Sequence, residues 1–454
     1  MLLLQCKSNC LLQANHQPTV LSVSHAEPSV NRDLLIQIHQ AEYPEARISH
    51  LAMTMSQNPA ASEDIYWDPF DTSIDSDPHA IWRAMRNTAP LYRNERYDFW
   101  ALSRFDDILS ASKDHSRLLS GHGTTLELMT TEPTNSGMIL TMDPPEHDQL
   151  RRLVSRAFTV GRVESLESHI RRICTDLLDP LMDSGGFDYV KQFGAVVPSL
   201  VIASLLGVPQ SDREWLRELI DTLFHLEPGI GMFNPISRRA GTDVKAYLSS
   251  ILSERRQYPV DDLLSHLAQA EITEDGRTRR LGHDEAVLFA YLLVTAGTET
   301  TGRLLSWAAL LLDEHADQRA EMVDDPLLVR GAIEELLRFE SPSPVQARFV
   351  AQDVAFHGMT IPAGSRLELI TGSAGRDERR FSNPDQFDIH RTGTHLSFGF
   401  GTHFCLGAAL ARLEARVALE ETLSRFPMWN VDRSRAVQAH TSTVRGYSSV
   451  PITF

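Results

Sequence analysis

The chain has 454 residues, with 43 Lys and Arg against 60 Asp and Glu, and a formal net charge of −17 at pH 7. This acidic balance argues against a general nucleic-acid surface, which depends on clustered Lys and Arg side chains. Four cysteines in a chain of this length are too few and too scattered for a disulfide framework, and they fit a reducing cytoplasm.

No segment has the pattern of a membrane span or a signal peptide. The apolar start at residues 1–12 is interrupted by Gln5, Lys7 and Asn9. The longest later apolar stretch, residues 286–296, is shorter than the ~18 residues that a bilayer crossing requires. We therefore expect a soluble, cytoplasmic protein without a membrane anchor.

Residues 1–62 are rich in Ser, Asn, Gln and Pro and lack sustained periodicity, which predicts a weakly ordered N-terminal extension. One domain is expected over residues 63–454. Apolar residues three and four apart predict most of its helices, at residues 78–88, 147–158, 163–182, 193–206, 213–226, 237–257, 284–314, 327–339 and 408–425. Strand-like alternation is confined to residues 90–97, 345–357 and 366–369. The predicted fold class is mainly α, a large single helical domain with a minor β region.

Residues 395–407 read His-Leu-Ser-Phe-Gly-Phe-Gly-Thr-His-Phe-Cys-Leu-Gly and directly precede the predicted helix 408–425. Cys405 thus lies at a helix start, where backbone N–H groups and the helix dipole lower a thiol pKa and favour the thiolate that ligates metals. Gly399 and Gly401 allow a tight turn, and Gly407 removes a side chain where a flat macrocycle would lie against the helix. The alternative is that Cys405 is a small buried hydrophobic residue.

Residues 398–407 match each fixed position of FGxGxHxCxG, the heme-binding loop of the cytochrome P450 family. From about Trp67 to the C-terminus the chain resembles the soluble bacterial members of that family. The resemblance implies the cytochrome P450 fold, with heme b (iron protoporphyrin IX) between a central distal helix and a proximal helix. It assigns Cys405 as the iron ligand and places Phe398, Gly399, His403 and Gly407 at the cofactor. Thiolate-ligated heme favours O–O cleavage, so the implied activity is that of a monooxygenase.

Glu335 and Arg338 are three residues apart and share one face of the predicted helix 327–339. Such a pair alone is weak evidence, because many exposed helices carry one. Arg391 lies in a segment, residues 384–391, that resembles the family segment whose arginine completes a Glu-Arg-Arg cluster. The resemblance implies that these three residues form a buried network with a structural role beneath the heme.

Residues 291–301 place an acid and several threonines in a helix that is otherwise apolar on nearly all sides. One interpretation is a polar kink in which threonine hydroxyls bond to the preceding turn. The segment AGTETT also resembles the distal-helix motif of the family, in which Ala296 and Gly297 border the heme and Gly297 makes room for dioxygen. The resemblance assigns Thr300 and Glu299 as the catalytic pair that delivers protons.

Four basic residues fall at family positions that bind the heme propionates, namely His147, Arg151, Arg348 and His403. The first two are four apart on one predicted helix and match the family pattern HxxxR. His395 is a weaker candidate for the same role. Taken singly, a basic pair on a helix is usually part of a solvated surface.

The chain has neither a GxGxxG nor a GxxxxGK[ST] motif, so electrons must come from another protein. The resemblance implies a ferredoxin or flavodoxin with its reductase, which would dock beside Cys405 near Arg412 and Arg416. These arginines are equally consistent with ordinary surface charge. The protein is expected to be a monomer.

The substrate walls are expected at residues 118–140, 226–235 and 343–347 and in the central helix near Leu293 and Val294. Their apolar side chains suggest a small molecule such as a lipid, terpenoid, steroid or polyketide, although the same residues suit a core: Leu126, Leu128, Met129, Met138, Ile139, Phe224, Ile230, Met232 and Phe233. A peroxide-driven peroxygenase and a non-catalytic heme-thiolate sensor or carrier remain alternatives. The Glu299–Thr300 pair favours the oxygen-dependent route.

Overall fold

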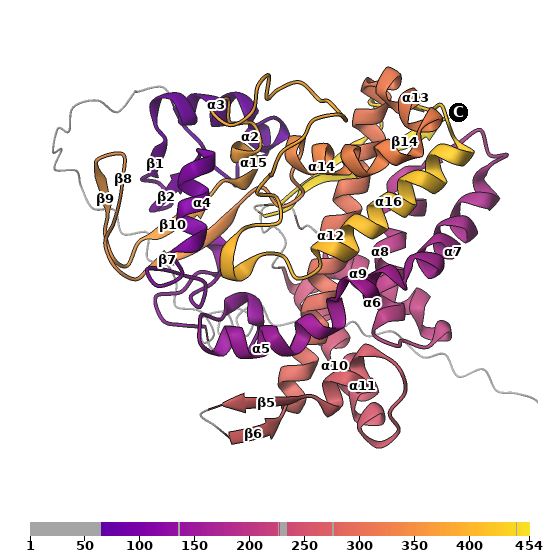
Figure 1. The fold of residues 1–454 in the computed structure, drawn as a ribbon, viewed down its shortest axis with the longest axis horizontal. Helices are drawn as coiled ribbons and strands as arrows, with labels where there is room; N and C mark the ends of the chain where they lie inside the picture. The colour runs from indigo at the N-terminus through magenta and orange to yellow at the C-terminus, as the bar shows by residue number, and fades with distance from the viewer. Residues whose placement is uncertain (1–64, 135–136, 226, 228–233, 275–276, 442) are drawn as a thin grey trace, which may run out of the picture. The chain divides into compact units, whose positions relative to one another are not determined.

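Helices form most of the chain in the computed structural model, which describes residues 65–134, 137–225, 227, 234–274, 277–441 and 443–454 (Figure 1). The α-helices are α2 (Thr72–Ser76), α3 (His79–Thr88), α4 (Phe105–Lys113), α5 (Glu146–Val154), α6 (Val160–Glu164), α7 (Glu167–Leu178), α8 (Val196–Leu205), α9 (Arg213–Leu223), α10 (Pro235–Gln257), α11 (Leu263–Gln269), α12 (His283–Glu314), α13 (Ala316–Asp324), α14 (Val329–Phe339), α15 (Thr371–Ala374) and α16 (Ala408–Arg425). The predicted extension at residues 1–62 lies outside the described residues, so its boundary stays a prediction.

The predicted helices agree with these elements over most of their length. The range 408–425 coincides with α16, and 284–314 begins one residue after the start of α12. The range 163–182 contains two helices, because α6 ends at Glu164 and α7 begins at Glu167, with Ser165 and Leu166 between them. Helix α4 was not predicted from the sequence, although its apolar residues Phe105, Ile108 and Ala111 are buried at helical spacing.

The strands form small sheets, of which the largest in the described chain has the order β1-β2-β10-β7-β3. Its strands come from distant parts of the sequence, so indigo β1 and β2 lie beside orange β7 and β10 in Figure 1. Strand β10 pairs parallel with β2 and antiparallel with β7. The strand bounds are β1 (Leu91–Asn94), β2 (Phe99–Leu102), β3 (Leu118–Leu119), β4 (Gly186–Asp188), β5 (Glu271–Glu274), β6 (Arg277–Arg280), β7 (Gln346–Val350), β8 (Val354–Phe356), β9 (Met359–Ile361), β10 (Arg366–Leu369), β11 (Asn430–Val431), β12 (Val437–His440), β13 (Arg445–Ser449) and β14 (Pro451–Thr453). The predicted strand 345–357 is therefore two strands, β7 and β8.

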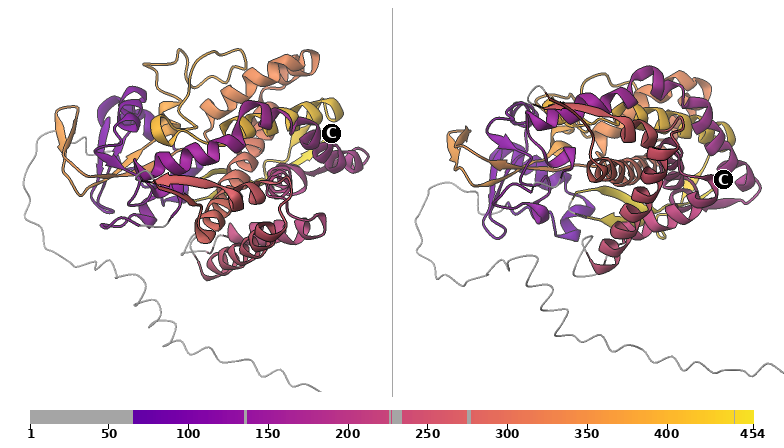
Figure 2. Two further views of the ribbon diagram at one scale, coloured as in Figure 1. Left: turned by 60° about the horizontal axis from the view of Figure 1, so that its bottom comes forward. Right: turned by 90° about the horizontal axis from the view of Figure 1, so that it is seen from below.

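Helix α12 is the long central helix that the sequence predicted. It starts at a cap in which the carboxylate of Glu285 accepts the backbone N–H of Gly282 at 2.6 Å. Most of its residues from Thr301 to Leu312 are buried, since α8, α10 and α16 all pack against it. Figures 1 and 2 show α12 within the helical part of the molecule, with the main sheet to one side. Among the described helices, none combines the length and apolar character that a bilayer crossing requires.

Candidate heme-thiolate site

Cys405 lies in a tight loop between β10 and α16, just before the first turn of α16. Its backbone N–H donates to the carbonyl of Phe398 at 2.9 Å, which closes the loop. Gly399 and Gly401 have φ values of +68° and +74°, a left-handed region that favours glycine. A Cβ at Gly401 would also lie 2.5 Å from the carbonyl oxygen of Ser112, so the loop packs directly against the end of α4.

Gly407 needs a different explanation. Its φ is −84°, which any residue adopts, and a Cβ built there would meet no protein atom within 4 Å. Nothing in the polypeptide therefore requires glycine at this position. The open space beside the first turn of α16 fits a flat group held against the helix next to Cys405.

Burial raises the pKa of the Cys405 thiol, and the backbone N–H of Gly407 and the charges of Arg151 and Arg412 oppose that rise. The sequence predicted that the helix start would lower the thiol pKa, and in the protein alone desolvation outweighs it. A metal ion bound to the sulfur would lower the thiol pKa enough to give the thiolate, because metal coordination deprotonates a thiol outright. Cys174 is also a free thiol, but it is fully buried, with a pKa raised by burial.

The structure brings together the four basic residues that the sequence singled out for the propionates. His147 and Arg151 lie on α5, Arg348 lies on β7, and His403 lies in the cysteine loop. The rings of His147 and His403 are 4.4 Å apart, and a guanidinium N–H of Arg151 donates to the carbonyl of Phe404 at 2.5 Å. The order of these residues along the chain thus predicted a real spatial cluster.

This basic cluster is only partly neutralised, by Asp148, which bonds Nδ1 of His147 at 2.9 Å, and by the charge of Asp143. Burial and the charges of Arg348, His147 and Arg151 lower the pKa of His403 to about 3. Burial lowers the pKa of Arg348 to about 10, and Nε2 of both His147 and His403 is buried without a hydrogen-bond partner. Buried polar groups normally have partners, so the cluster fits a cofactor with two carboxylates beside an open space at Gly407.

Glu335 lies at the centre of a buried network beneath the loop. Its carboxylate accepts two hydrogen bonds from Arg338, at 2.6 and 2.7 Å, and one from Nε of Arg391 at 3.1 Å. Arg338 and Arg391 also donate to backbone carbonyls of the segment that leads to the loop, including Pro384 and Gln386. The predicted Glu335–Arg338–Arg391 cluster is confirmed.

Glu334, the residue before Glu335 on α14, contacts basic side chains on both sides of the cysteine loop in the sequence. Sequence reasoning missed these contacts. The Glu334 carboxylate accepts from Nε of Arg412 at 2.6 Å, and it lies 3.1 Å from Nε2 of His395. His395 is thus engaged by Glu334, and its weaker candidacy as a propionate ligand stays a prediction. The Arg412 guanidinium lies 4.5 Å from the ring centre of Phe398, so these contacts hold both ends of the cysteine loop.

The two arginines predicted for partner docking are engaged within the chain. Arg412 pairs with Glu334, and Arg416 has a mostly buried side chain that pairs with Glu167 and Glu420. Neither projects as a free cation, which weakens the sequence argument for docking through these two side chains. The Arg416–Glu420 pair has helical spacing and was open to sequence reasoning, but the Glu167 contact was not, because Glu167 lies 249 residues from Arg416.

The central helix carries Ala296, Gly297, Glu299 and Thr300 within one continuous helical segment. The hydroxyl of Thr300 donates to the carbonyl of Ala296 at 2.8 Å, the local bonding expected of threonine in a helix. A Cβ at Gly297 would lie 2.9 Å from Cδ1 of Ile202 on α8. Packing against α8 thus disfavours a side chain at Gly297 only mildly, because the end of the Ile202 side chain can shift, and the room for dioxygen stays a prediction.

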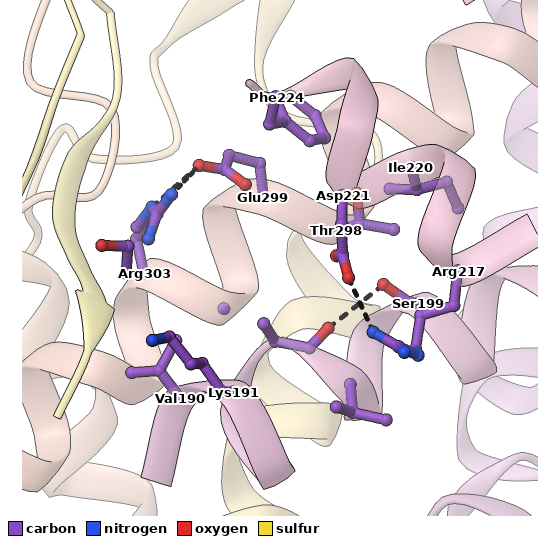
Figure 3. Close-up of a pocket in the computed structure, with 14 residues that line it drawn as sticks. Val190, Lys191, Ser199, Arg217, Ile220, Asp221, Phe224, Thr298, Glu299 and Arg303 are labelled. Carbon is purple, nitrogen blue, oxygen red and sulfur yellow. Dashed lines mark hydrogen bonds and ion pairs between the residues drawn. The ribbon is translucent and has the colours of Figure 1, made fainter. Parts of the chain in front are cut away.

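Glu299 lines a cavity beside α12, and Figure 3 shows its side chain there. Nε of Arg303, one turn later, donates to its carboxylate at 2.8 Å. Burial raises the pKa of Glu299, and Arg303 opposes the rise. Thr300 is not among the residues that line this cavity, although Thr298 is. Arg303 could have been found from the sequence, since it lies four residues after Glu299 on the same helix.

Several residues predicted to line the substrate space belong to the packed core instead. Leu126 and Met129 pack with Trp67 and Val345, and Ile139 packs in the main helical core. Phe224 lines the cavity beside Glu299. Ile230, Met232 and Phe233 lie outside the described residues.

The fold, the cysteine loop and the buried basic cluster define a heme-thiolate protein. The family model "Cytochrome P450" matches residues 315–443. The chain is 38% identical over 399 residues to the vitamin D(3) 25-hydroxylase of Pseudonocardia autotrophica, with 85% of this chain and 96% of that protein covered.

Two solved structures have the same fold. The cytochrome P450 PksS of the Bacillus subtilis bacillaene polyketide synthase has a TM-score of 0.78 and 31% identity, over 86% of this chain and 99% of that one. CYP109E1 of Bacillus megaterium, in complex with testosterone, has a TM-score of 0.74 and 31% identity, over 83% and 99%. The chain belongs to the cytochrome P450 family, as a bacterial-type heme-thiolate monooxygenase that binds heme b and uses redox partners and small-molecule substrates.

Proposed function

We propose that the chain hydroxylates an apolar polycyclic molecule of the steroid or polyketide kind, using dioxygen and electrons from a ferredoxin or flavodoxin with its reductase. The observation that carries the oxygen-dependent route is the central helix, where a buried acid, Glu299, directly precedes Thr300. A peroxide-driven enzyme or a heme-thiolate sensor would have no use for a proton-delivering pair.

The proposed heme-binding residues have distinct tasks. Cys405 holds the iron, and His147, Arg151, Arg348 and His403 bind the propionates. Phe398, Gly399 and Gly407 of the cysteine loop and Ala296 and Gly297 of the central helix would contact the heme. When bound, the heme supplies the activation of dioxygen, which the thiolate ligand favours.

Thr300 and Glu299 are proposed to move protons. The hydroxyl of Thr300 is held by its bond to Ala296, so Oγ1 has a fixed position from which it can pass on a proton. Glu299 holds a proton readily, because burial raises its pKa. A side chain near its working pKa exchanges a proton most effectively with its neighbours.

The substrate class is supported by relatives rather than by a described cavity. One relative is named for hydroxylation of vitamin D3, which is a secosteroid, and one structural neighbour is in complex with testosterone. A third belongs to a polyketide synthase. Vitamin D3 and testosterone share an apolar ring skeleton, which matches the apolar residues that flank the central helix in the sequence.

The test begins with the absorption spectrum of the reduced, carbon-monoxide-bound protein, which reports thiolate ligation. The oxidised protein is then titrated with vitamin D3, testosterone and a polyketide macrolactone, with palmitic acid as an acyclic comparison, while the heme spin state is followed. We expect spin-state shifts with at least one polycyclic compound. Shifts with palmitic acid alone would overturn the substrate class.

Turnover of the best ligand separates the functional alternatives. We expect oxygenated product with NADPH, a surrogate ferredoxin and ferredoxin reductase. Product with hydrogen peroxide and none with the electron-transfer proteins would identify a peroxygenase. Ligand binding without product under either condition would identify a sensor or carrier.

A further inference from the structure

A cavity of about 420 Å³ lies beside α12 and is lined also by residues of α8, α9 and β13 and of the π-helical turn Val190–Gly194 (Figure 3). It is separate from the proposed heme site, because Cys405 and the basic cluster do not line it. Its charged lining residues are Lys191, Arg217, Asp221, Glu299 and Arg303. We call it the α9–α12 cavity.

The charged side chains form a gradient from solvent to interior. Asp221 of α9 has 54% of its side chain exposed and bonds Nη1 of Arg217 at 2.6 Å. Glu299 and Arg303 of α12 are only 15% and 11% exposed. The cavity thus links a carboxyl group in contact with solvent to the buried carboxyl group of the central helix.

We propose that the α9–α12 cavity is a water-filled route by which protons reach Glu299 from solvent, and that Asp221 is its outer proton-carrying group. This inference rests on the proposed function, in which Glu299 supplies protons to Thr300. Asp221 acts through Glu299 and does not touch the heme or the substrate. It is therefore a positioning residue for proton supply.

The electrostatics of the cavity suit this role. Partial burial raises the pKa of Asp221, although its carboxyl group still contacts solvent, and the deeper burial of Glu299 raises the pKa of that group. The negative charge of Asp221 raises the pKa of Glu299 further. The cations that face the two acids are Arg303 of α12, Arg217 of α9 and Lys191 of the π-helical turn. Each acid thus remains able to take up a proton while its arginine stabilises the ionised form.

The proposed transfer conserves atoms and charge. A proton leaves a carboxyl oxygen of Asp221, passes through water in the cavity and binds a carboxylate oxygen of Glu299. Asp221 becomes a carboxylate beside Arg217 and regains a proton from solvent. No electrons move. Five charged side chains around one cavity favour water over an apolar ligand as its content.

The first test measures the carboxyl group of Glu299 without turnover. Infrared difference spectra of the oxidised, heme-loaded protein are recorded as a function of pH, and the Glu299 band is assigned by its loss in Glu299→Gln. We expect the pKa of Glu299 to fall in Asp221→Asn, because the nearby negative charge is removed, and to recover in Asp221→Glu. An unchanged Glu299 titration in Asp221→Asn would overturn the coupling.

Asp243→Asn is the matched control. Asp243 pairs with Arg239 four residues earlier on α10, as Asp221 pairs with Arg217 on α9, but it does not line the cavity. It should leave the titration of Glu299 unchanged. A fall of the same size in Asp243→Asn would overturn a specific role for Asp221.

The second test measures turnover. We expect Asp221→Asn to lower the rate of product formation by roughly tenfold and to enlarge the solvent isotope effect, while ligand affinity stays unchanged. If Glu299→Gln impairs coupling and Asp221→Asn does not, the proton route is wrong and the proposed function stands. If Glu299→Gln has no effect on coupling, the proposed role of Glu299 itself fails.

Discussion

Two regions of the molecule pair their acidic side chains in opposite ways. Around α14, Glu334, Glu335 and Glu340 each contact basic side chains from distant segments. At the α9–α12 cavity, Glu299 and Asp221 each pair with an arginine four residues away on their own helix. The first arrangement joins separate parts of the chain, whereas the second adds nothing to the connections between helices.

The pKa directions follow this difference. His395 and Arg412 lower the pKa of Glu334 to about 2, and His79, Arg445 and Arg376 lower that of Glu340. Burial instead raises the pKa of both cavity acids. The acids around α14 are held ionised and fix the position of the segments around the cysteine loop. The acids of the cavity can hold a proton, which suits a path for protons.

Glu335→Ala should have the largest effect, because it leaves Arg338 and Arg391 buried without their shared carboxylate. Removing one member of a buried ion-pair network costs about 3–5 kcal/mol. We expect misfolded protein or a loss of heme content, measured by soluble yield, heme absorbance and the free energy of unfolding in urea.

Asp114→Ala is the control for this variant. Asp114 pairs with Arg117 at the same three-residue spacing, but Arg117 is 47% exposed. A surface pair contributes about 0–1 kcal/mol, so this variant should stay folded and retain its heme. Full heme occupancy and unchanged stability in Glu335→Ala would contradict the role of the network.

The same comparison explains what the sequence could predict. The cysteine loop, the Glu335 network and the basic cluster were found because each depends on short motifs or on their order along the chain. Glu334 was missed because Arg412 lies 78 residues away, and Glu340 because Arg445 lies 105 residues away. Partners at such separations follow from packing, which helical periodicity does not specify.

Short elements were lost for a related reason. The main sheet joins β2 to β10, whose Trp100 and Leu367 are register partners across more than half of the chain. Strand β10 was predicted at residues 366–369, but β2, which also has four residues, was missed because so few alternations seldom identify a strand alone. The long, strongly apolar α12 and the 18-residue α16 were recognised because their signals are local.

Glu368→Gln should stabilise the protein, whereas Glu335→Ala should destabilise it. Glu368 of β10 is a buried acid whose Oε2 has no hydrogen-bond partner. Burial, with the charge of Glu127, raises its pKa to about 8. The folded pKa therefore lies above the unfolded value near 4.5. The native state keeps its full stability below about pH 4.5 and loses it progressively as the pH rises towards 8.

The neutral amide should remove this loss. A rise of one pKa unit corresponds to 1.36 kcal/mol, so Glu368→Gln should gain about 3 kcal/mol of unfolding free energy at pH 7 and little at pH 4.5. Urea denaturation at both pH values measures the difference. Equal effects at the two pH values would show that Glu368 finds a counter-charge in the folded protein.

Thr300→Ala tests proton delivery from the central helix, next to the cavity acid Glu299, and should leave folding intact. The hydroxyl bonds within its own helix, so its loss breaks no contact between helices. We expect normal heme content and ligand titration, with the ratio of product to consumed NADPH falling by about tenfold, or 1.4 kcal/mol, as hydrogen peroxide forms instead. Unchanged coupling would refute the proposed proton delivery by Thr300.

Glu334→Gln should have the smallest effect, because the Glu334 side chain is 37% exposed and solvent screens its charge. Its folded pKa of about 2 lies below the usual 4.5, so its contribution is present above about pH 4.5 and is lost as the pH falls towards 2. Glutamine cannot ionise, so the variant should lose less than about 1 kcal/mol at pH 7 and should show a flatter fall in stability between about pH 5 and 3. If the stability of the variant falls with pH as steeply as that of the unmodified protein, Glu334 does not hold the cysteine loop through its charge. The loop would then depend on the Glu335 network alone.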